Sequence, residues 1–344
     1  MPAPESETSM SARIATTLST LFIASLLCLT SAAQSVSNPA PANPILPNAD
    51  PFITLHPIHG CYLLLATTGH NITIWSGKTI PTASSESKVV FTPTDGMDQL
   101  WSPTLWQIDG RWWIYFTARQ PSNSTGQPSR EHAIYVLESD TADPLGSYTF
   151  KGPLNLGRPA IDPSVLTLNG VHYLMYVTVD RGENAIQIVR LAHPMQPSGT
   201  PSLIAEPEYP WEKGAGSIRT YPVNEGPTAL YHHGNVFIVY SASDTASPLY
   251  CLGLLTYQGG DPLNRSHWKK SPQPVFSASP ANHIYGPGRG TFAIAADGSY
   301  WLLYAAKSTD DPTPSNRQTR AQRFTWNPDG TPNFGNPLRD GPIN

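Results

Sequence analysis

Apolar and aromatic residues gather in five short runs along the chain, and a glycine precedes each run. The glycines are Gly60, Gly110, Gly170, Gly234 and Gly298, spaced by 50, 60, 64 and 64 residues, and the runs read CYLLLATT, RWWIYFTA, VHYLMYVT, NVFIVYSA and SYWLLYAA. His, Asp or Asn stands before each glycine, which is the chemistry of a tight hairpin turn that needs positive φ. The runs are rich in β-branched and aromatic residues and too short for helices. The pattern therefore predicts a strand, a turn and a second strand, repeated five times.

A proline marks the segment before each of these turns. The segments are Asp50-Pro51-Phe52-Ile53, Ser102-Pro103-Thr104-Leu105, Asp162-Pro163-Ser164-Val165, Glu225-Gly226-Pro227-Thr228 and Tyr285-Gly286-Pro287-Gly288. Further strand-like runs, such as 133–138, 185–191 and 250–257, complete units of 50–64 residues without helical periodicity. Repeats of this length made only of strands predict an all-β fold, a five-bladed β-propeller over residues 34–344. Because kelch-like propellers of similar period are mostly binding scaffolds, the fold alone does not set the function.

The composition excludes two classes of protein. Charged residues make up 13% of the 344 residues and aromatic residues 10%. No basic stripe is present to neutralise phosphates, so the chain is neither disordered nor nucleic-acid binding. The 36 prolines are spread along the chain and indicate many short loops rather than one linker.

The first 33 residues have the pattern of a signal peptide. Arg13 precedes an apolar run over 18–29, and Ser31-Ala32-Ala33 has the small residues of a cleavage site. The run is too short to span a membrane comfortably, and no later stretch is apolar enough. We therefore expect a secreted protein that is not bound to a membrane, with residues 34–344 as its catalytic domain. The alternative for residues 1–33 is a disordered tail.

Export bears on the cysteines and on glycosylation. Cys61 and Cys251 lie in the mature chain and could form a disulfide or stay as buried free thiols, and the sequence leaves both open. Asn71, Asn123 and Asn264 begin glycosylation sequons. Asn123, in a loop rich in Pro, Ser and Gly, is the best candidate for modification.

Acidic residues stand at the start of the innermost strand in three of the five units. These residues are Asp50, Asp162 and Glu225, each beside a proline or one residue from it. Innermost strands line the channel of a propeller, so the three carboxyls should converge, repel one another and raise at least one pKa. A pair of carboxyls suits glycoside hydrolysis, whereas capping of turns would explain any one acid alone. Oxygen-only metal sites usually need more ligands, and no calcium loop or serine or cysteine nucleophile motif is present.

At these residues the chain resembles glycoside hydrolase family 43, whose members are five-bladed propellers that act on arabinan and xylan. The segments that carry the resemblance are Asn48-Ala49-Asp50-Pro51, Leu100-Trp101-Ser102-Pro103, Ala160-Ile161-Asp162-Pro163, Val223-Asn224-Glu225-Gly226-Pro227, Tyr250-Cys251-Leu252-Gly253-Leu254-Leu255 and the tail 319–326. They cover nearly the whole mature chain in order. The last two segments look most like the branch of exo-acting α-1,5-L-arabinofuranosidases.

The resemblance implies an inverting mechanism with a role for each acid. Asp50 would be the general base that activates water, Glu225 the general acid, and Asp162 the residue that tunes the pKa of Glu225 and orients it. An inverting pair should stand about 6.5–9.5 Å apart, with room for water. The substrates implied are arabinan or arabinoxylan and their oligosaccharides. Endo-arabinanase and β-xylosidase activities stay open within the class.

Three positions depart from the family pattern. Arg289 replaces a histidine that contacts a central water or cation in the family, Ala305 replaces a second histidine, and Thr104 replaces a glutamate. No cofactor is therefore expected, and a central calcium ion is in doubt with Arg289 in place. Arg289 could donate to sugar hydroxyls or pair with the acids. These losses also keep open a non-catalytic carbohydrate-binding propeller.

Several side chains are candidates for contacts with the sugar. Trp101 could stack on a sugar ring or pack between blades. Trp75, His70 and Asn71 follow a Thr-Thr-Gly turn and could line the rim of the same cleft. Trp112 and Trp113 alternate along a strand and are expected in the core.

Overall fold

The computed structural model describes residues 40–119, 131–180, 182–214 and 221–343. The expected signal peptide at 1–33 and the sequon at Asn123 lie outside these ranges. Among the residues described, no helix is long and apolar enough to cross a membrane. The only helical elements in these ranges are three 3₁₀ turns, η1 (Ile80–Thr82), η2 (Arg265–His267) and η3 (Pro280–Asn282).

Five four-stranded antiparallel sheets form the blades of a propeller, and their strands follow one another in chain order. Blade 1 consists of β2 (Phe52–Ile53), β3 (Tyr62–Leu65), β4 (Ile72–Gly77) and β5 (Glu86–Phe91). Blade 2 consists of β6 (Asp98–Ile108), β7 (Arg111–Arg119), β8 (His132–Ser139) and β9 (Tyr148–Pro153). Blade 3 consists of β10 (Ile161–Leu168), β11 (Val171–Asp180), β12 (Glu183–His193) and β13 (Gln196–Ala205). Blade 4 consists of β14 (Asn224–His232), β15 (Asn235–Ala242), β16 (Cys251–Tyr257) and β17 (Trp268–Lys270). Blade 5 consists of β18 (Tyr285–Ile294), β19 (Tyr300–Lys307), β20 (Gln318–Trp326) and β21 (Pro332–Asn333).

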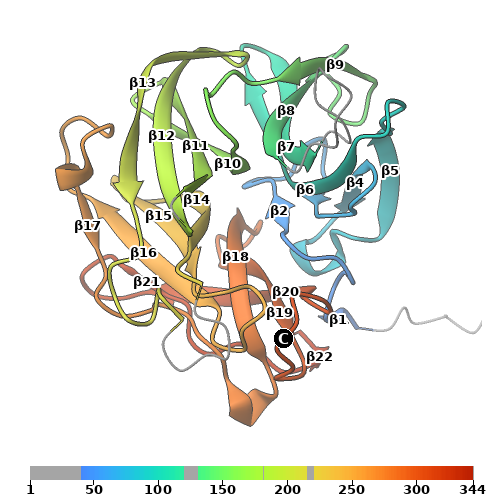
Figure 1. Cartoon of the computed structure of the whole chain (residues 1–344). Helices are drawn as coiled ribbons and strands as arrows, with labels where there is room; N and C mark the ends of the chain where they lie inside the picture. The colour runs from blue at the N-terminus through green and yellow to red at the C-terminus, as the bar shows by residue number, and fades with distance from the viewer. Residues whose placement is uncertain (1–39, 120–130, 181, 215–220, 344) are drawn as a thin grey trace, which may run out of the picture. The chain divides into compact units, whose positions relative to one another are not determined.

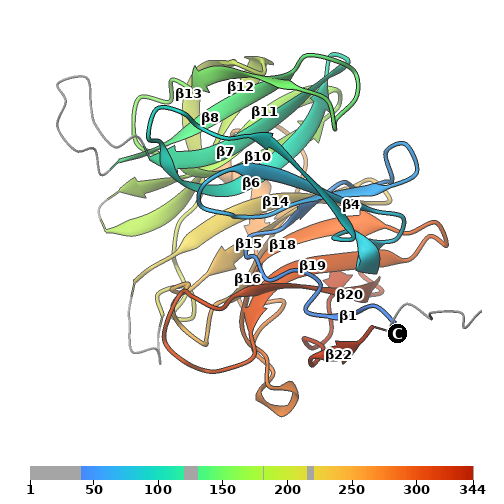
Figure 2. The same cartoon turned by 90° about the vertical axis from the view of Figure 1, so that its right-hand side faces the viewer.

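The first strand of every blade is the innermost one, and these strands surround the centre in Figure 1. The prediction of an all-β, five-bladed propeller is confirmed. A sixth, two-stranded sheet pairs β1 (Ala42–Asn43) with β22 (Gly341–Pro342). Asn43 exchanges hydrogen bonds with the backbone of Ala321, so these strands lie against β20 of blade 5 (Figure 2).

Four of the five predicted hairpins have two consecutive residues with positive φ, as a tight turn requires. The residues before the glycines in these four are His59, Asp109, Asn169 and His233. In the fifth hairpin Gly298 has the predicted positive φ, but Asp297 does not. Asp297 instead accepts a hydrogen bond from the backbone N–H of Ser299, which widens the turn.

The fourth residue after each repeat glycine lies in the core. Leu64, Ile114, Leu174, Ile238 and Leu302 are each 0% exposed. Burying such a side chain contributes about 1.5–3 kcal/mol, so the repeated apolar runs stabilise all five blades in the same way. Trp112 and Trp113 are buried too, which confirms the prediction that they belong to the core.

The two cysteines of the described chain are free thiols. Cys251 is buried in a hydrophobic cluster between blades 3 and 4, whereas Cys61 is partly exposed. The sequence leaves open a disulfide or two free thiols, and in the structure Cys61 and Cys251 are free thiols.

Candidate active site

In every blade, the residue before the proline of the innermost strand has a left-handed backbone. The φ angles are 57° at Asp50, 49° at Ser102, 55° at Asp162, 57° at Gly226 and 57° at Gly286. In blades 2 to 5 the ladder between the first two strands shifts its register at this point. A positive φ is unusual for Asp and Ser, and a bulge changes the direction in which a side chain points. These five positions are therefore structurally equivalent.

Glu225 does not occupy the position held by the acids of blades 1 and 3, and the sequence-based alignment of the three acids is wrong on this point. The left-handed residue of blade 4 is Gly226, so Glu225 corresponds to Trp101 in blade 2 and Ile161 in blade 3. A Cβ at Gly226 would lie 2.9 Å from Cδ of Arg289, so a larger residue does not fit there without a shift. The acid of blade 4 comes from the preceding position of the strand instead.

The strand starts surround a pocket with a volume of about 370 Å³. Residues from all five blades line it, namely Asp50, Thr67, Trp101, Ser102, Ile161, Asp162, Glu225, Thr245, Tyr250, Arg289, Pro314 and Arg317. The structure thus brings together five of the eight predicted site residues: the three acids, Trp101 and Arg289.

Asp50 lies between a hydroxyl and a guanidinium group. Its Oδ2 accepts a hydrogen bond from Thr67 Oγ1 at 2.8 Å, and its Oδ1 accepts one from Arg317 Nη1 at 2.7 Å. Burial would raise the pKa of Asp50, but the charges of Arg317 and Arg289 and the two hydrogen bonds together hold it below its ordinary value of 3.8. Asp50 is therefore ionised at neutral pH and can accept a proton.

Glu225 has the opposite electrostatic environment. Its side chain is 7% exposed, Oε1 accepts a hydrogen bond from Tyr250 Oη at 2.8 Å, and Oε2 accepts one from Asn184 Nδ2 at 2.7 Å. Burial, followed by the negative charge of Asp162, raises the pKa of Glu225 to about 7. The expectation that one of the three carboxyls has a raised pKa is confirmed at this residue. Glu225 can hold a proton at a pH where Asp50 is charged.

Asp162 connects the neighbouring blades. Its Oδ1 accepts a hydrogen bond from Ser102 Oγ at 2.7 Å, and its Oδ2 accepts one from the backbone N–H of Gly226 at 3.0 Å. The second contact holds the residue next to Glu225 in the chain. Asp162 therefore both fixes the start of β14 and supplies the negative charge that acts on Glu225.

Arg289 places a second guanidinium group in the pocket. Its side chain is 4% exposed, and its Nη1 lies 3.8 Å from Asp162 Oδ2. That nitrogen is a buried donor without a hydrogen-bond acceptor in the described chain. Such a donor can bind a hydroxyl oxygen that enters the pocket.

The residues present do not fit a central calcium ion. The described chain contains no group of three or more His, Cys, Asp or Glu side chains that could hold a metal. Arg289 adds positive charge beside Asp162, which opposes a cation at that place. Thr104 and Ala305, the other two departures from the family pattern, are buried, and Thr104 donates to the carbonyl of Pro163.

The aromatic and polar candidates for sugar contacts divide into two groups. Trp101 lines the pocket and stacks on His132, with ring centroids 4.3 Å apart. Trp75, His70 and Asn71 are not among the lining residues. Trp75 packs on the core cluster between blades 1 and 5, and the exposed His70 bonds to the backbone of its own loop. Asn71 accepts a hydrogen bond from Thr73.

Sequence reasoning missed the residues that hold the two key carboxyls. Arg317 lies in the loop between β19 and β20, where no repeat or motif singles it out. Asn184 is the second residue of β12 and reaches Glu225 only because β12 runs beside the start of β14. Tyr250 could have been noticed, because it opens a segment that carries the family resemblance.

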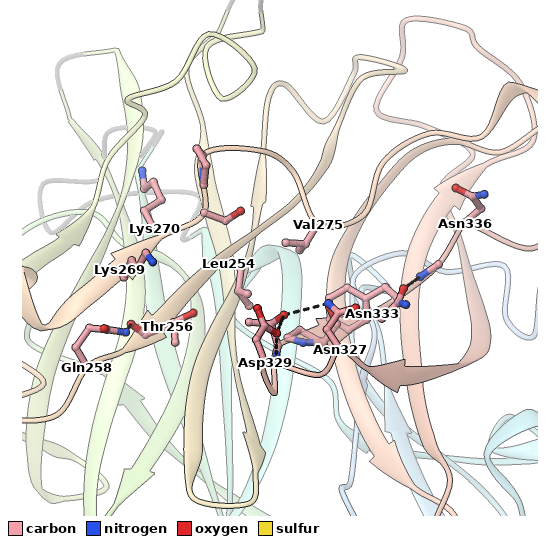
Figure 3. A pocket seen from close by; sticks show the side chains of 16 residues that line it. Leu254, Thr256, Gln258, Lys269, Lys270, Val275, Asn327, Asp329, Asn333 and Asn336 are labelled. Atoms are coloured by element: carbon pink, nitrogen blue, oxygen red, sulfur yellow. Dashed lines mark hydrogen bonds between the residues drawn. The ribbon is translucent and has the colours of Figure 1, made fainter.

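A second cavity of about 640 Å³ lies between the outer strands of blades 4 and 5 (Figure 3). Its lining contains one carboxylate, Asp329, together with Lys269 and Lys270. A mechanism that needs two carboxyls has no place there, so the pocket at the strand starts is the candidate active site.

The family model for glycosyl hydrolases family 43 matches residues 41–332, which include every blade. The chain belongs to this family. The resemblance read from the strand starts is therefore confirmed.

Several relatives of the chain are named arabinofuranosidases, and others, at 26% identity, are named arabinan endo-1,5-α-L-arabinosidases. An extracellular exo-α-(1→5)-L-arabinofuranosidase of Streptomyces avermitilis is 40% identical over 257 residues, which are 70% of this chain and 51% of that protein. Alpha-L-arabinofuranosidase 43 of Humicola insolens is 34% identical over 345 residues, or 94% of this chain and 69% of that protein. The chain thus spans about half the length of the first relative and about two thirds of the second. The crystal structure of an α-L-arabinofuranosidase from Lactobacillus brevis superposes with a TM-score of 0.77 at 31% identity, covering 87% of this chain and 97% of that one.

Proposed function

We propose that this protein is a secreted, exo-acting α-L-arabinofuranosidase that removes L-arabinofuranosyl units from arabinan or arabino-oligosaccharides with inversion of configuration. The observation that carries the proposal is one pocket in which Asp50 has a lowered pKa and Glu225 a raised one. Two carboxyls with opposite shifts are what acid and base catalysis of glycoside hydrolysis needs.

In the proposed mechanism Glu225 acts as the general acid. Its neutral carboxyl donates a proton to the glycosidic oxygen as the bond to the anomeric carbon breaks. Below about pH 7 the raised pKa keeps this proton in place. Asp162 keeps the pKa high by its charge and keeps Glu225 in position through the backbone of Gly226.

Asp50 acts as the general base on the other side of the sugar. It takes a proton from a water molecule, whose oxygen attacks the anomeric carbon from the face opposite the leaving group. Thr67 donates a hydrogen bond to one carboxylate oxygen of Asp50 and Arg317 donates to the other, and together they fix the orientation of the carboxylate. Trp101 offers a ring face to the sugar, and Arg289 Nη1 offers an unused donor to its hydroxyls.

Exo action and secretion rest on separate support. The pocket is bounded by loops of blades 4 and 5 that contribute Thr245, Tyr250, Pro314 and Arg317, and its volume suits a short terminal portion of a sugar chain. The relative from Streptomyces avermitilis is named as an exo-acting extracellular enzyme. Residues 1–33 have the pattern of a signal peptide.

The product profile on linear α-1,5-arabinan tests the proposal. We expect free arabinose from the first minutes, with a polymer that shortens slowly. A ladder of arabino-oligosaccharides would contradict exo action and favour an endo-arabinanase. No turnover of arabinan, xylan-derived substrates or 4-nitrophenyl α-L-arabinofuranoside would favour a carbohydrate-binding propeller.

A further inference from the structure

A buried ammonium group contacts two loops that supply residues to the lining of the active-site pocket. Lys307 is the last residue of β19, and its side chain is 0% exposed. Its Nζ donates hydrogen bonds to the carbonyl oxygens of Asp311, of Thr313 at 3.1 Å and of Ala246 at 3.5 Å. The carboxylate of Asp311 lies 3.9 Å away. Three backbone carbonyls around one cation form a contact that a neutral apolar side chain cannot replace.

These carbonyls belong to two loops that supply walls of the pocket. Ala246 lies in the loop 243–250 between β15 and β16, which carries Thr245 and Tyr250. Asp311 and Thr313 lie in the loop 308–317 between β19 and β20, which carries Arg317. The first loop comes from blade 4 and the second from blade 5.

Each loop ends in a residue that holds one of the two key carboxyls. Tyr250 donates its hydroxyl hydrogen to Glu225, and Arg317 donates to Asp50. We propose that Lys307 is a positioning residue that holds these two loops together. It thereby fixes the positions of both Tyr250, which donates to Glu225, and Arg317, which donates to Asp50. This inference rests on the proposed function, because it assigns Lys307 a role through Asp50 and Glu225.

The charge of Lys307 is needed for this role. Burying an ammonium group is costly unless hydrogen bonds and nearby charge offset the loss of water. Burial lowers the pKa of Lys307, the charges of Asp311 and Asp310 raise it, and the charge of Arg317 lowers it. The contact of the ammonium with three carbonyls and Asp311 offsets part of this cost, and the pKa of Lys307 stays below its ordinary value.

Loss of the contact should act on Asp50 through Arg317. Arg317 and Arg289 are the charged groups that lower the pKa of Asp50, and Arg317 lies in a loop that Lys307 contacts. A loop released from Lys307 would let Arg317 move away from Asp50. The pKa of Asp50 would then rise. As the pH decreases, Asp50 would become protonated, and unable to act as a base, at a higher pH than in the wild type.

The experiment is the pH profile of kcat/KM for the full-length Lys307→Met variant on 4-nitrophenyl α-L-arabinofuranoside. We expect its acidic limb to move to higher pH and kcat to fall by up to about 10²-fold, with a smaller change in KM. Lys269→Met, which replaces an exposed lysine away from the pocket, is the matched control and should behave as wild type. A Lys307→Met profile that coincides with the control would overturn the inference.

Chemical rescue separates positioning from a general loss of structure. Activity of Lys307→Ala should rise with added n-propylammonium chloride but not with tetramethylammonium chloride, which has the charge without an N–H donor. Equal responses to both salts would count against the role of the ammonium donor. The strands of the five blades pair without these two loops, so the inference expects Lys307→Met and Lys307→Ala to fold. Failure of both Lys307 variants to fold would therefore overturn it as well. Wild-type turnover that Asp50→Ala and Glu225→Ala leave unchanged would instead reject the proposed function.

Discussion

Arg317 donates a hydrogen bond to Oδ1 of Asp50 across 2.7 Å, although 267 positions separate the two residues in the chain. The contact joins a loop of the last blade to the start of the first blade, and both residues line the pocket. It also gives Asp50 a pKa below its ordinary value, despite burial that acts in the opposite direction. A loop near the far end of the sequence thus contributes to the low pKa of the proposed base, together with Arg289 and Thr67.

Replacing Arg317 by methionine should weaken the enzyme most at low pH. Without the guanidinium the pKa of Asp50 rises, so the base becomes protonated, and inactive, at a pH where it is charged in the wild type. The acidic limb of the kcat/KM profile should move to higher pH. Arg323→Met, at a guanidinium that is 53% exposed and paired with Asp297, is the control. Acidic limbs that coincide in both variants would show that Arg317 does not tune the base.

The wild-type profile should have its basic limb near neutrality. Glu225 must be protonated to donate, and burial together with the charge of Asp162 raises its pKa to about 7. Activity should therefore fall as the pH increases through about 7. Asp50 has a lowered pKa, so the acidic limb should lie at low pH and leave a broad plateau between the two. Activity that still increases between pH 7 and 9 would be inconsistent with Glu225 as the acid.

The two carboxyls proposed as acid and base, Glu225 and Asp50, should differ in their dependence on the leaving group. Removal of a general acid costs about 10²–10⁴-fold, and less for substrates whose leaving group needs no protonation. Glu225→Ala should therefore lose more activity on arabinan than on the nitrophenyl arabinoside, whereas Asp50→Ala should lose activity on both. Steady-state rates of the two variants on both substrates check this. The reverse order would exchange the two roles.

The repeat positions of the core should matter for stability rather than for catalysis. Leu302 is fully buried in the cluster that joins blades 4 and 5. Leu302→Ala should lower the free energy of unfolding by about 2–5 kcal/mol, whereas Val89→Ala, at a side chain that is 51% exposed, should change it by less than about 0.5 kcal/mol. Urea denaturation followed by fluorescence measures both. Equal stabilities of the two variants would mean that the repeat does not mark the core.

The sequence predicted the blades because each repeats one local pattern. A turn glycine and an apolar run decide a hairpin within about ten residues, so Gly170 and Leu174 can be assigned without knowledge of the rest of the chain. The acids could be found for a related reason, since Asp50 and Asp162 stand directly before a proline near the start of an innermost strand.

Other features depend on contacts that no local pattern contains. Arg317 has no repeat partner, and its contact with Asp50 exists only when the last blade meets the first. Trp75 has the kind of side chain that can stack on a sugar, but it packs on the core. An aromatic residue on a strand can point to the core or to a binding surface, and the sequence does not distinguish the two. The offset of Glu225 by one position follows from Gly226, which takes the left-handed conformation beside Arg289.

The configuration of the first product tests the central claim most directly, because only an acid and a base separated by a water molecule invert it. Proton NMR during the first minutes of hydrolysis of an α-L-arabinofuranoside should show β-L-arabinofuranose, followed by slow equilibration with its other forms. If the α anomer appeared first, a carboxylate would be attacking the sugar itself, and the assignment of Asp50 as a base and Glu225 as its partner acid would be contradicted.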